Sequence, residues 1–205
     1  MLLAIDSSIG TSVAVVDRDG GILAELTVGD TMRHAEVVGA LIRDALAEAR
    51  VTAADLSAVA CGMGPGPFTG LRIGIAAARA FAFGAAKPVV PLVSHDAIAW
   101  AWYQAGNTGD LLVATDARRR ELYWSTYSGL TAAGLPARSS APALAKPEDV
   151  PDGDVKRLDA TEVSAGALGM LAELTWATGS AFAADEPLYL RSPDISMSTR
   201  KRVTA

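Results

Sequence analysis

The chain has 205 residues with a formal net charge of −5, and half of its residues are apolar while a fifth are charged. A mean hydropathy of +0.26 excludes a disordered protein, and the negative charge argues against binding nucleic acid through the overall field of the molecule. The single cysteine excludes an internal disulfide and suits a reducing cytosol. We therefore expect a cytoplasmic globular protein with more apolar surface than one compact chain readily hides.

A membrane location is not expected. Three basic side chains, Arg72, Arg79 and Lys87, interrupt the longest apolar stretch before it reaches membrane-spanning length. The opening residues MLLAIDSS lack a basic region and turn polar at Asp6, so they do not resemble a signal peptide.

The first thirty residues predict three antiparallel strands joined by hairpins, over Leu2–Ile5, Thr11–Asp17 and Ile22–Val28. The first hairpin, DSSIGTS, carries Asp6, Ser7 and Ser8. Such a polar hairpin can hold a phosphate or magnesium ion, or it can satisfy its own backbone through Asx- and Ser-type turns. The residues alone leave both readings open.

Two helices and two strands are predicted next. Ala35–Arg50 has apolar residues on one half of a helical wheel, and a buried strand follows over Leu56–Gly62. A glycine-rich loop leads into a helix over Thr69–Gly84, followed by a strand over Pro88–Val93. A further helix is expected to begin with Ser94 as its N-cap.

The order βββαβαβα fills residues 1–105, which we expect to form an N-terminal lobe, and the polar stretch AGNTGD marks its end. Residues 106–193 are expected to form a smaller C-terminal lobe, and residues 194–205 a flexible tail. That second lobe should begin with a strand pair around DARRR. A loop over Gly134–Asp154, a helix over Val163–Thr178 and a strand over Pro187–Arg191 are expected to follow.

The stretch GMGPGPFTGLRIG, residues 62–74, resembles a phosphate-binding loop at first sight. It lacks the Gly-Lys-Ser/Thr ending of a Walker A loop, and the strand before it does not stand in a Rossmann context. A helix N-terminus can still bind an anion through free N–H groups, whereas prolines at 65 and 67 and a capping threonine favour a rigid turn. The candidates for a vestigial nucleotide or anion site are Asp6, Ser7, Ser8, Gly64, Gly66 and Thr69.

The helix after this loop is apolar around most of its circumference, since only Arg72 and Arg79 interrupt it before Phe83. Such a helix needs cover on a second side, which either the chain's own core or a partner supplies. We favour a partner. The predicted interface residues on this helix and on the preceding one are Val38, Leu41, Ile42, Ala45, Leu71, Gly74, Ile75, Ala78, Arg79 and Ala82.

Four segments, AIDSS, GMGPGPFTGLRIGIAAARAFAFG, TDARRRELYWSTY and EPLYLR, occur in the order found in the TsaB (YeaZ) family, which the chain resembles along nearly its whole length. The resemblance implies an α/β fold of the actin-like ATPase (ASKHA, ribonuclease H-like) type. Two lobes, each a mixed sheet with helices, are then expected. The second lobe is expected to be reduced, because the segment over Asp152–Glu162 is short.

The resemblance also implies a function: a non-catalytic partner subunit needed to form N6-threonylcarbamoyladenosine in tRNA. Such a subunit binds and activates a TsaD-like catalytic subunit, helps to recruit a TsaE-like P-loop ATPase and meets tRNA through the complex. Alone it forms a homodimer through the same two helices. The alternatives are a stand-alone enzyme of the same fold, either a small phosphotransferase or a hydrolase, or a regulatory homodimer.

Few residues suggest chemistry of their own, and we expect no catalytic residue, no metal and no cofactor, with ATP or ADP restricted to the interface of a complex. TsaD-type enzymes carry an H-x-x-x-H metal pair on a helix, but here His34 is followed by Val38. His95 stands alone, and Cys61 falls in a buried strand. The arginines at 118–120 form a hairpin tip that either faces solvent or meets tRNA or an acidic partner.

Overall fold

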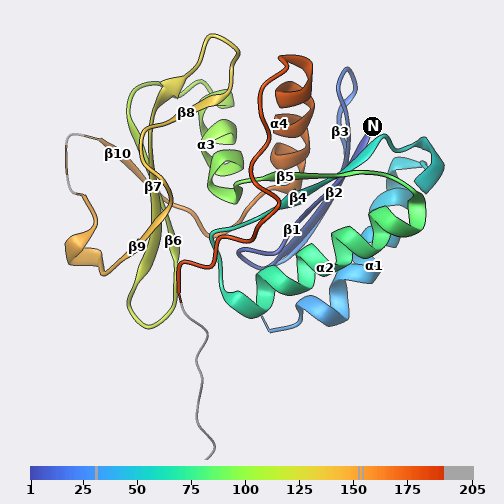
Figure 1. Cartoon of the computed structure of the whole chain (residues 1–205), viewed down its shortest axis with the longest axis horizontal. Coiled ribbons are helices and arrows are strands. Elements are labelled where there is room, and N and C mark those ends of the chain that lie inside the picture. Colours follow the sequence, from blue (N-terminus) through green and yellow to red (C-terminus); the bar gives the residue numbers. More distant parts are fainter. Residues whose placement is uncertain (31, 152, 154, 192–205) are drawn as a thin grey trace, which may run out of the picture.

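The structure is a computed structural model that describes residues 1–30, 32–151, 153 and 155–191. The chain forms two five-stranded sheets with helices on both sides of the first (Figure 1). The expected mixed α/β class is therefore confirmed. The predicted tail over residues 194–205 lies outside the described residues. Within the described ranges, no helix combines the length and the apolar character needed to cross a bilayer.

The first sheet has the strand order β3-β2-β1-β4-β5 and is mixed, because β1 pairs antiparallel with β2 and parallel with β4. The three antiparallel strands expected at the start of the chain are confirmed, since β2 also pairs antiparallel with β3. The strands are β1 (Leu2–Asp6), β2 (Thr11–Asp17), β3 (Gly21–Val28), β4 (Ala58–Gly62) and β5 (Val89–Leu92).

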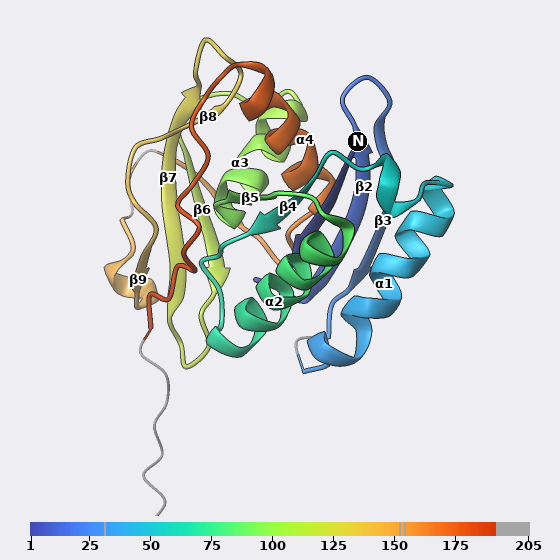
Figure 2. The same ribbon diagram turned by 45° about the vertical axis from the view of Figure 1, so that its right-hand side comes forward.

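Helices cover both faces of this sheet, which buries β1 completely. The helices α1 (His34–Ala49) and α2 (Phe68–Ala85) lie on one face, and α3 (Ser94–Gln104) and α4 (Ala165–Ala177) lie on the other (Figures 1 and 2). Alternate side chains of a strand point to opposite faces. Leu3 therefore joins the core under α1 and α2, whereas its neighbour Ala4 joins the core under α3 and α4.

The second sheet has the order β10-β6-β7-β8, with β9 also paired to β7. Its strands are β6 (Leu111–Asp116), β7 (Leu122–Leu130), β8 (Pro136–Arg138), β9 (Ala143–Ala145) and β10 (Lys156–Asp159). The loop predicted over Gly134–Asp154 was wrong, because it contains β8, β9 and a 3-10 turn at Pro147–Asp149. The predicted strand over Pro187–Arg191 was also wrong: the segment forms no ladder, and its backbone meets the glycine-rich loop where Leu188 N–H donates to Met63 C=O at 2.8 Å.

Two predicted helix caps were wrong. The N-cap of α2 is Pro67, not Thr69, and that of α3 is Val93, not Ser94. Neither cap uses a side chain, and the Ser94 hydroxyl is committed elsewhere. α4, by contrast, has a side-chain cap, because Ser164 Oγ accepts a 2.9 Å bond from Ala167 N–H.

The strands divide between the sheets near the predicted lobe boundary, with β1 to β5 before residue 105 and β6 to β10 after it. α4 crosses this division, since it comes from the later part of the chain and yet packs on β1 and β2. The exact lobe limits stay a prediction.

Candidate functional site

Asp6 ends β1 at the centre of the first sheet and is almost fully buried. Its Oδ1 accepts a 2.7 Å bond from Ser8 N–H, and its Oδ2 accepts bonds of 2.5 Å from Ser94 Oγ and 3.3 Å from Ser8 Oγ. Ser94 in turn accepts a 3.1 Å bond from Gly64 N–H. Burial raises the pKa of Asp6, while these hydrogen bonds lower it in part. The carboxyl group therefore has its partners inside the protein.

Ser7 connects the same turn to α2. Its hydroxyl donates a 2.8 Å bond to Gly70 C=O, in the first turn of that helix. A Cβ built on Gly74, one helical turn later, would collide with Ser7 Oγ and lie 2.7 Å from Ser7 Cβ. A Cβ on Gly70 would lie 2.8 Å from Ser7 C=O. Two glycines four residues apart thus let the helix backbone rest directly on the β1–β2 turn.

The glycine-rich loop closes over the turn from the other side. A Cβ on Gly62 would collide with Asp6 Oδ2, and one on Gly66 would lie 2.8 Å from Ser8 Cα. Gly64 is at φ +93°, a conformation that side-chain-bearing residues rarely adopt. The glycines of this loop therefore serve close packing against the first hairpin.

Of the six candidate residues for an anion or nucleotide, five come together here: Asp6, Ser7, Ser8, Gly64 and Gly66. Thr69 does not join them, because its side chain is exposed on the first turn of α2. In this arrangement the hairpin, the loop and the start of α2 are in direct contact with one another.

His34, at the start of α1, is buried and its Nδ1 lies 2.8 Å from Thr11 Oγ1. Val38, one turn later, is buried in the core under α1. Among the described residues, no group of three His, Cys, Asp or Glu side chains has the geometry to hold a metal ion. Cys61 is buried, and burial raises the pKa of its thiol, which disfavours the reactive thiolate.

Sequence reasoning missed a buried polar chain that ties α3 to the second sheet. His95 Nδ1 lies 2.8 Å from Ser125 Oγ on β7, and its Nε2 lies 3.1 Å from Thr115 Oγ1 on β6. Burial lowers the pKa of His95 to about 3, so the ring is neutral at physiological pH. All three residues are buried, so this serine is closed to a substrate. Contacts across 20 and 30 residues leave no local signal in the sequence.

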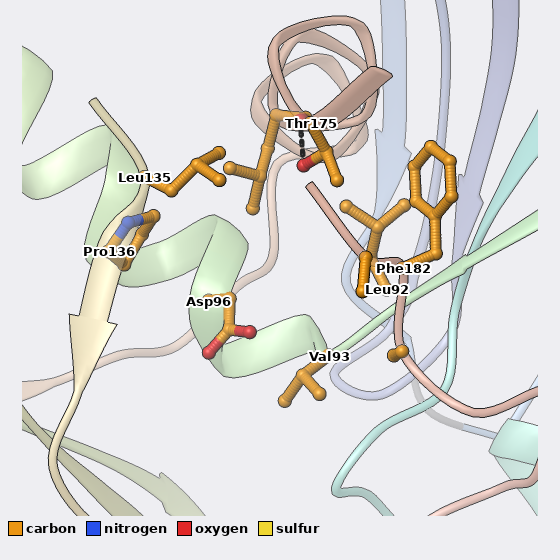
Figure 3. A pocket seen from close by; sticks show the side chains of 10 residues that line it. Leu92, Val93, Asp96, Leu135, Pro136, Thr175 and Phe182 are labelled. Carbon is orange, nitrogen blue, oxygen red and sulfur yellow. Dashed lines mark hydrogen bonds between the residues drawn. The ribbon is translucent and has the colours of Figure 1, made fainter. Parts of the chain in front are cut away.

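Next to His95 in the sequence, Asp96 borders a cavity of about 160 Å³ between α3, α4 and the start of β8 (Figure 3). Asp96 Oδ1 accepts a 2.8 Å bond from Tyr127 Oη and lies 3.3 Å from Arg138 Nη1. Burial raises the pKa of Asp96, and the charge of Arg138 lowers it in part. The Thr175 hydroxyl, also in this cavity, donates to Leu171 C=O at 2.7 Å. Asp96 Oδ1 and the Thr175 hydroxyl are thus already engaged within the protein.

Most of the predicted interface residues are buried within this chain, and their place in an interface stays a prediction. Eight of the predicted residues are buried in the chain's own core: Val38, Ile42, Ala45, Leu71, Gly74, Ile75, Ala78 and Ala82. Leu41 is half-buried, and Arg79 is exposed with its Nη2 2.8 Å from Asp185 Oδ1. The sheet covers one side of α2 and α1 covers the next, so the chain itself supplies much of the cover that we assigned to a partner.

A stripe of apolar residues nevertheless remains on the outer side of α2. We call it the outer stripe, and it consists of Ile73, Ala76, Ala77, Ala80 and Phe83. The spacing of three and four residues places them on one face of the helix. Ala76, Ala80 and Phe83 are exposed, and Phe83 is 89% accessible. This surface, not the predicted buried set, is what α2 offers to another molecule.

The family model that matches this chain is that of TsaD, described as tRNA N6-adenosine threonylcarbamoyltransferase, and the match covers residues 5–151. The matched region contains the end of β1, the glycine-rich loop, α2 and the β6–β7 hairpin.

Curated relatives and a solved structure are also similar to this chain. An uncharacterized protein of Mycobacterium tuberculosis is 40% identical over 203 residues, which cover 94% of this chain and 92% of that protein. The Escherichia coli tRNA threonylcarbamoyladenosine biosynthesis protein TsaB is 34% identical over 127 residues, 62% of this chain and 54% of that protein. The structure of YeaZ from Pseudomonas aeruginosa has a TM-score of 0.77 at 29% identity, and the match covers 92% of this chain and 99% of that one.

Proposed function

The chain belongs to the TsaD family and is TsaB-like within it, and from this premise we propose that it is a non-catalytic subunit in the formation of threonylcarbamoyladenosine in tRNA. It binds and activates a TsaD-like catalytic subunit, and the pair recruits a TsaE-like ATPase. Any ATP or ADP is bound at the interface between subunits, not within this chain.

One observation carries the non-catalytic part of this proposal. In an actin-like ATPase the hairpin after the first strand must leave room for phosphate oxygens. Here Gly70 and Gly74 of α2 lie against Ser7 so closely that neither could gain a methyl group without a shift. The carboxyl group of Asp6, which could otherwise face a cation, is held by Ser8 and Ser94. A nucleotide would have to break these contacts before it could bind.

The outer stripe supports the partner-binding part. Contiguous exposed apolar patches often mark interaction sites, and in the outer stripe Phe83, the most exposed large apolar side chain among the described residues, lies on one helix face with Ala76 and Ala80. Alanines at 76 and 80 bring the helix backbone within reach of a partner helix. Half-buried Leu41 extends the apolar surface onto the neighbouring helix α1.

The decisive experiment is reconstitution of threonylcarbamoyl transfer to tRNA with the TsaD-like and TsaE-like proteins, with and without this chain. Wild-type chain should be required for turnover, and Phe83→Asp should abolish both stimulation and co-purification with the TsaD-like subunit. Trp176→Asp is the matched control, because Trp176 is an aromatic residue 76% exposed on α4, away from the outer stripe. Turnover independent of this chain contradicts the proposal, and so does normal association of Phe83→Asp.

Calorimetry on the isolated chain separates this proposal from a stand-alone enzyme. We expect no heat of binding when ATP and magnesium are added, because the hairpin is closed by Ser7 and α2. Tight binding together with turnover of ATP would favour an enzyme in its own right.

A further inference from the structure

The tip of the β6–β7 hairpin has an unusual backbone. Arg118, Arg119 and Arg120 follow one another with φ angles of +64°, +53° and +62°. This left-handed region is unfavourable for residues with a Cβ, and it is normally visited by single residues, most often Gly, Asn or Asp. All three arginines are exposed. We call this segment the arginine turn.

Contacts within the protein hold the turn in this shape. Ala117 N–H donates to Glu121 C=O at 2.9 Å, and Arg118 N–H donates to Asp116 Oδ1 at 2.8 Å. The Arg191 guanidinium, from the far end of the described chain, donates to Ala117 C=O at 2.8 Å and to Arg118 C=O at 3.3 Å, and it pairs with Glu121. These contacts hold the two ends of the turn, at Ala117 and Arg118 and at Glu121.

The backbone conformation alone does not favour arginine at these positions. Glycine or asparagine would adopt the same φ angles at lower cost. The chain as a whole is acidic, with a net charge of −5, so three adjacent positive charges stand out against its field. Strain kept at exposed charged residues points to a binding role for their side chains.

We propose that the arginine turn contacts the phosphate backbone of the tRNA substrate. The planar guanidinium group can bind a phosphate through two parallel hydrogen bonds, which makes arginine well suited to this ligand. The loop ARRRE carries no aromatic side chain on which a base could stack, so the contact reads charge and not sequence. This inference rests on the proposed function, which makes tRNA the substrate of the complex.

The position of the turn fits such a role. Both views place it at the same end of the molecule as the first turn of α2, the helix that carries the outer stripe (Figures 1 and 2). A tRNA held by a partner at this end of α2 would lie at the end of the molecule that carries the arginine turn. The turn would add phosphate contacts without entering the partner's active site.

The test compares tRNA binding by the assembled complex containing wild-type chain or the variant R118N/R119N/R120N. Asparagine tolerates the left-handed region, so the variant should keep its fold, as circular dichroism and thermal melting would check. Anisotropy of a fluorescently labelled tRNA transcript should show about tenfold weaker binding or more at low salt. The slope of log K against log salt should fall by about three, roughly one for each lost phosphate contact.

Arg50→Asn provides a matched control. Arg50 is exposed and also has a positive φ, +58°, but it caps the far end of α1. Its replacement should leave the affinity and the salt slope unchanged. Equal tRNA affinity and slope for wild type and the triple variant would overturn the inference.

Two further outcomes separate the alternatives. If the triple variant fails to join the complex, the turn is a contact for an acidic protein surface and the inference is wrong. If the wild-type chain has no effect on tRNA modification, the proposed function is wrong, whatever tRNA affinity is measured. If stimulation persists in the triple variant with unchanged tRNA affinity, the proposed function stands and only the arginine turn is refuted.

Discussion

The Ser7 hydroxyl donates a 2.8 Å hydrogen bond to the carbonyl oxygen of Gly70, which joins the β1–β2 turn to the first turn of α2. The N-terminal end of a helix normally offers free N–H groups to an anion. Here the helix is drawn so close to the hairpin that Gly74 also meets Ser7. The glycine-rich stretch before α2 therefore shapes a packed junction, and the same junction fixes which side of α2 faces outward.

Gly74→Ala tests how tight this junction is. The new Cβ would collide with the Ser7 hydroxyl, so we expect the free energy of unfolding to fall by about 1–3 kcal/mol, despite the higher helix propensity of alanine. Gly84→Ala is the control on the same helix, where a Cβ meets no atom within 4 Å. That variant should be unchanged or more stable by up to about 1 kcal/mol. Urea denaturation measures both, and equal stability of the two variants would contradict the packing argument.

Asp6 should impose a pH dependence on stability. Burial raises its pKa in the folded chain above the unfolded value of 3.8, so between these values the folded state binds more protons than the unfolded state. The contribution of Asp6 is therefore fully present below 3.8 and is lost as pH rises through the folded pKa. Asp6→Asn cannot ionise and should lack this loss.

Unfolding free energies of wild type and Asp6→Asn, measured across the acidic range, give the difference directly. The unfolding free energy of Asp6→Asn should rise relative to that of wild type as the pH increases above 3.8. Ser94→Ala should widen the window, because the hydrogen bond from Ser94 lowers the pKa of Asp6. Parallel pH profiles for wild type and Asp6→Asn would show that Asp6 titrates as it does in the unfolded chain.

Ala78→Glu should unfold the protein and not merely separate it from a partner. Ala78 has no accessible surface, and an uncompensated charge at such a site costs on the order of 3–5 kcal/mol, a large part of a typical domain's stability. Phe83→Asp on the outer stripe should leave the melting temperature close to that of wild type. Thermal melting distinguishes them, and a folded Ala78→Glu variant would mean that Ala78 is more accessible than the structure shows.

Local patterns were enough for the longer elements. The alternation in Thr11–Asp17 and the helical periodicity after His34 each report an element that buries one face, and both elements are confirmed. The actin-like fold expected from the four motifs is likewise confirmed, by the family match and by the YeaZ structure. The strands β8, β9 and β10 were missed because they are only three or four residues long and lack the apolar run that revealed β5.

The sequence by itself determined the family and the order of the elements from β1 to β7, because these follow from residue type and spacing along the chain. Only the tertiary structure decided which face of α2 is covered, since an alanine such as Ala78 and one such as Ala80 look alike until the sheet and α1 take their places. It also decided that Ser94 holds Asp6 across 88 residues and does not cap its own helix. Contacts of that range depend on how the layers pack, and no local pattern encodes them.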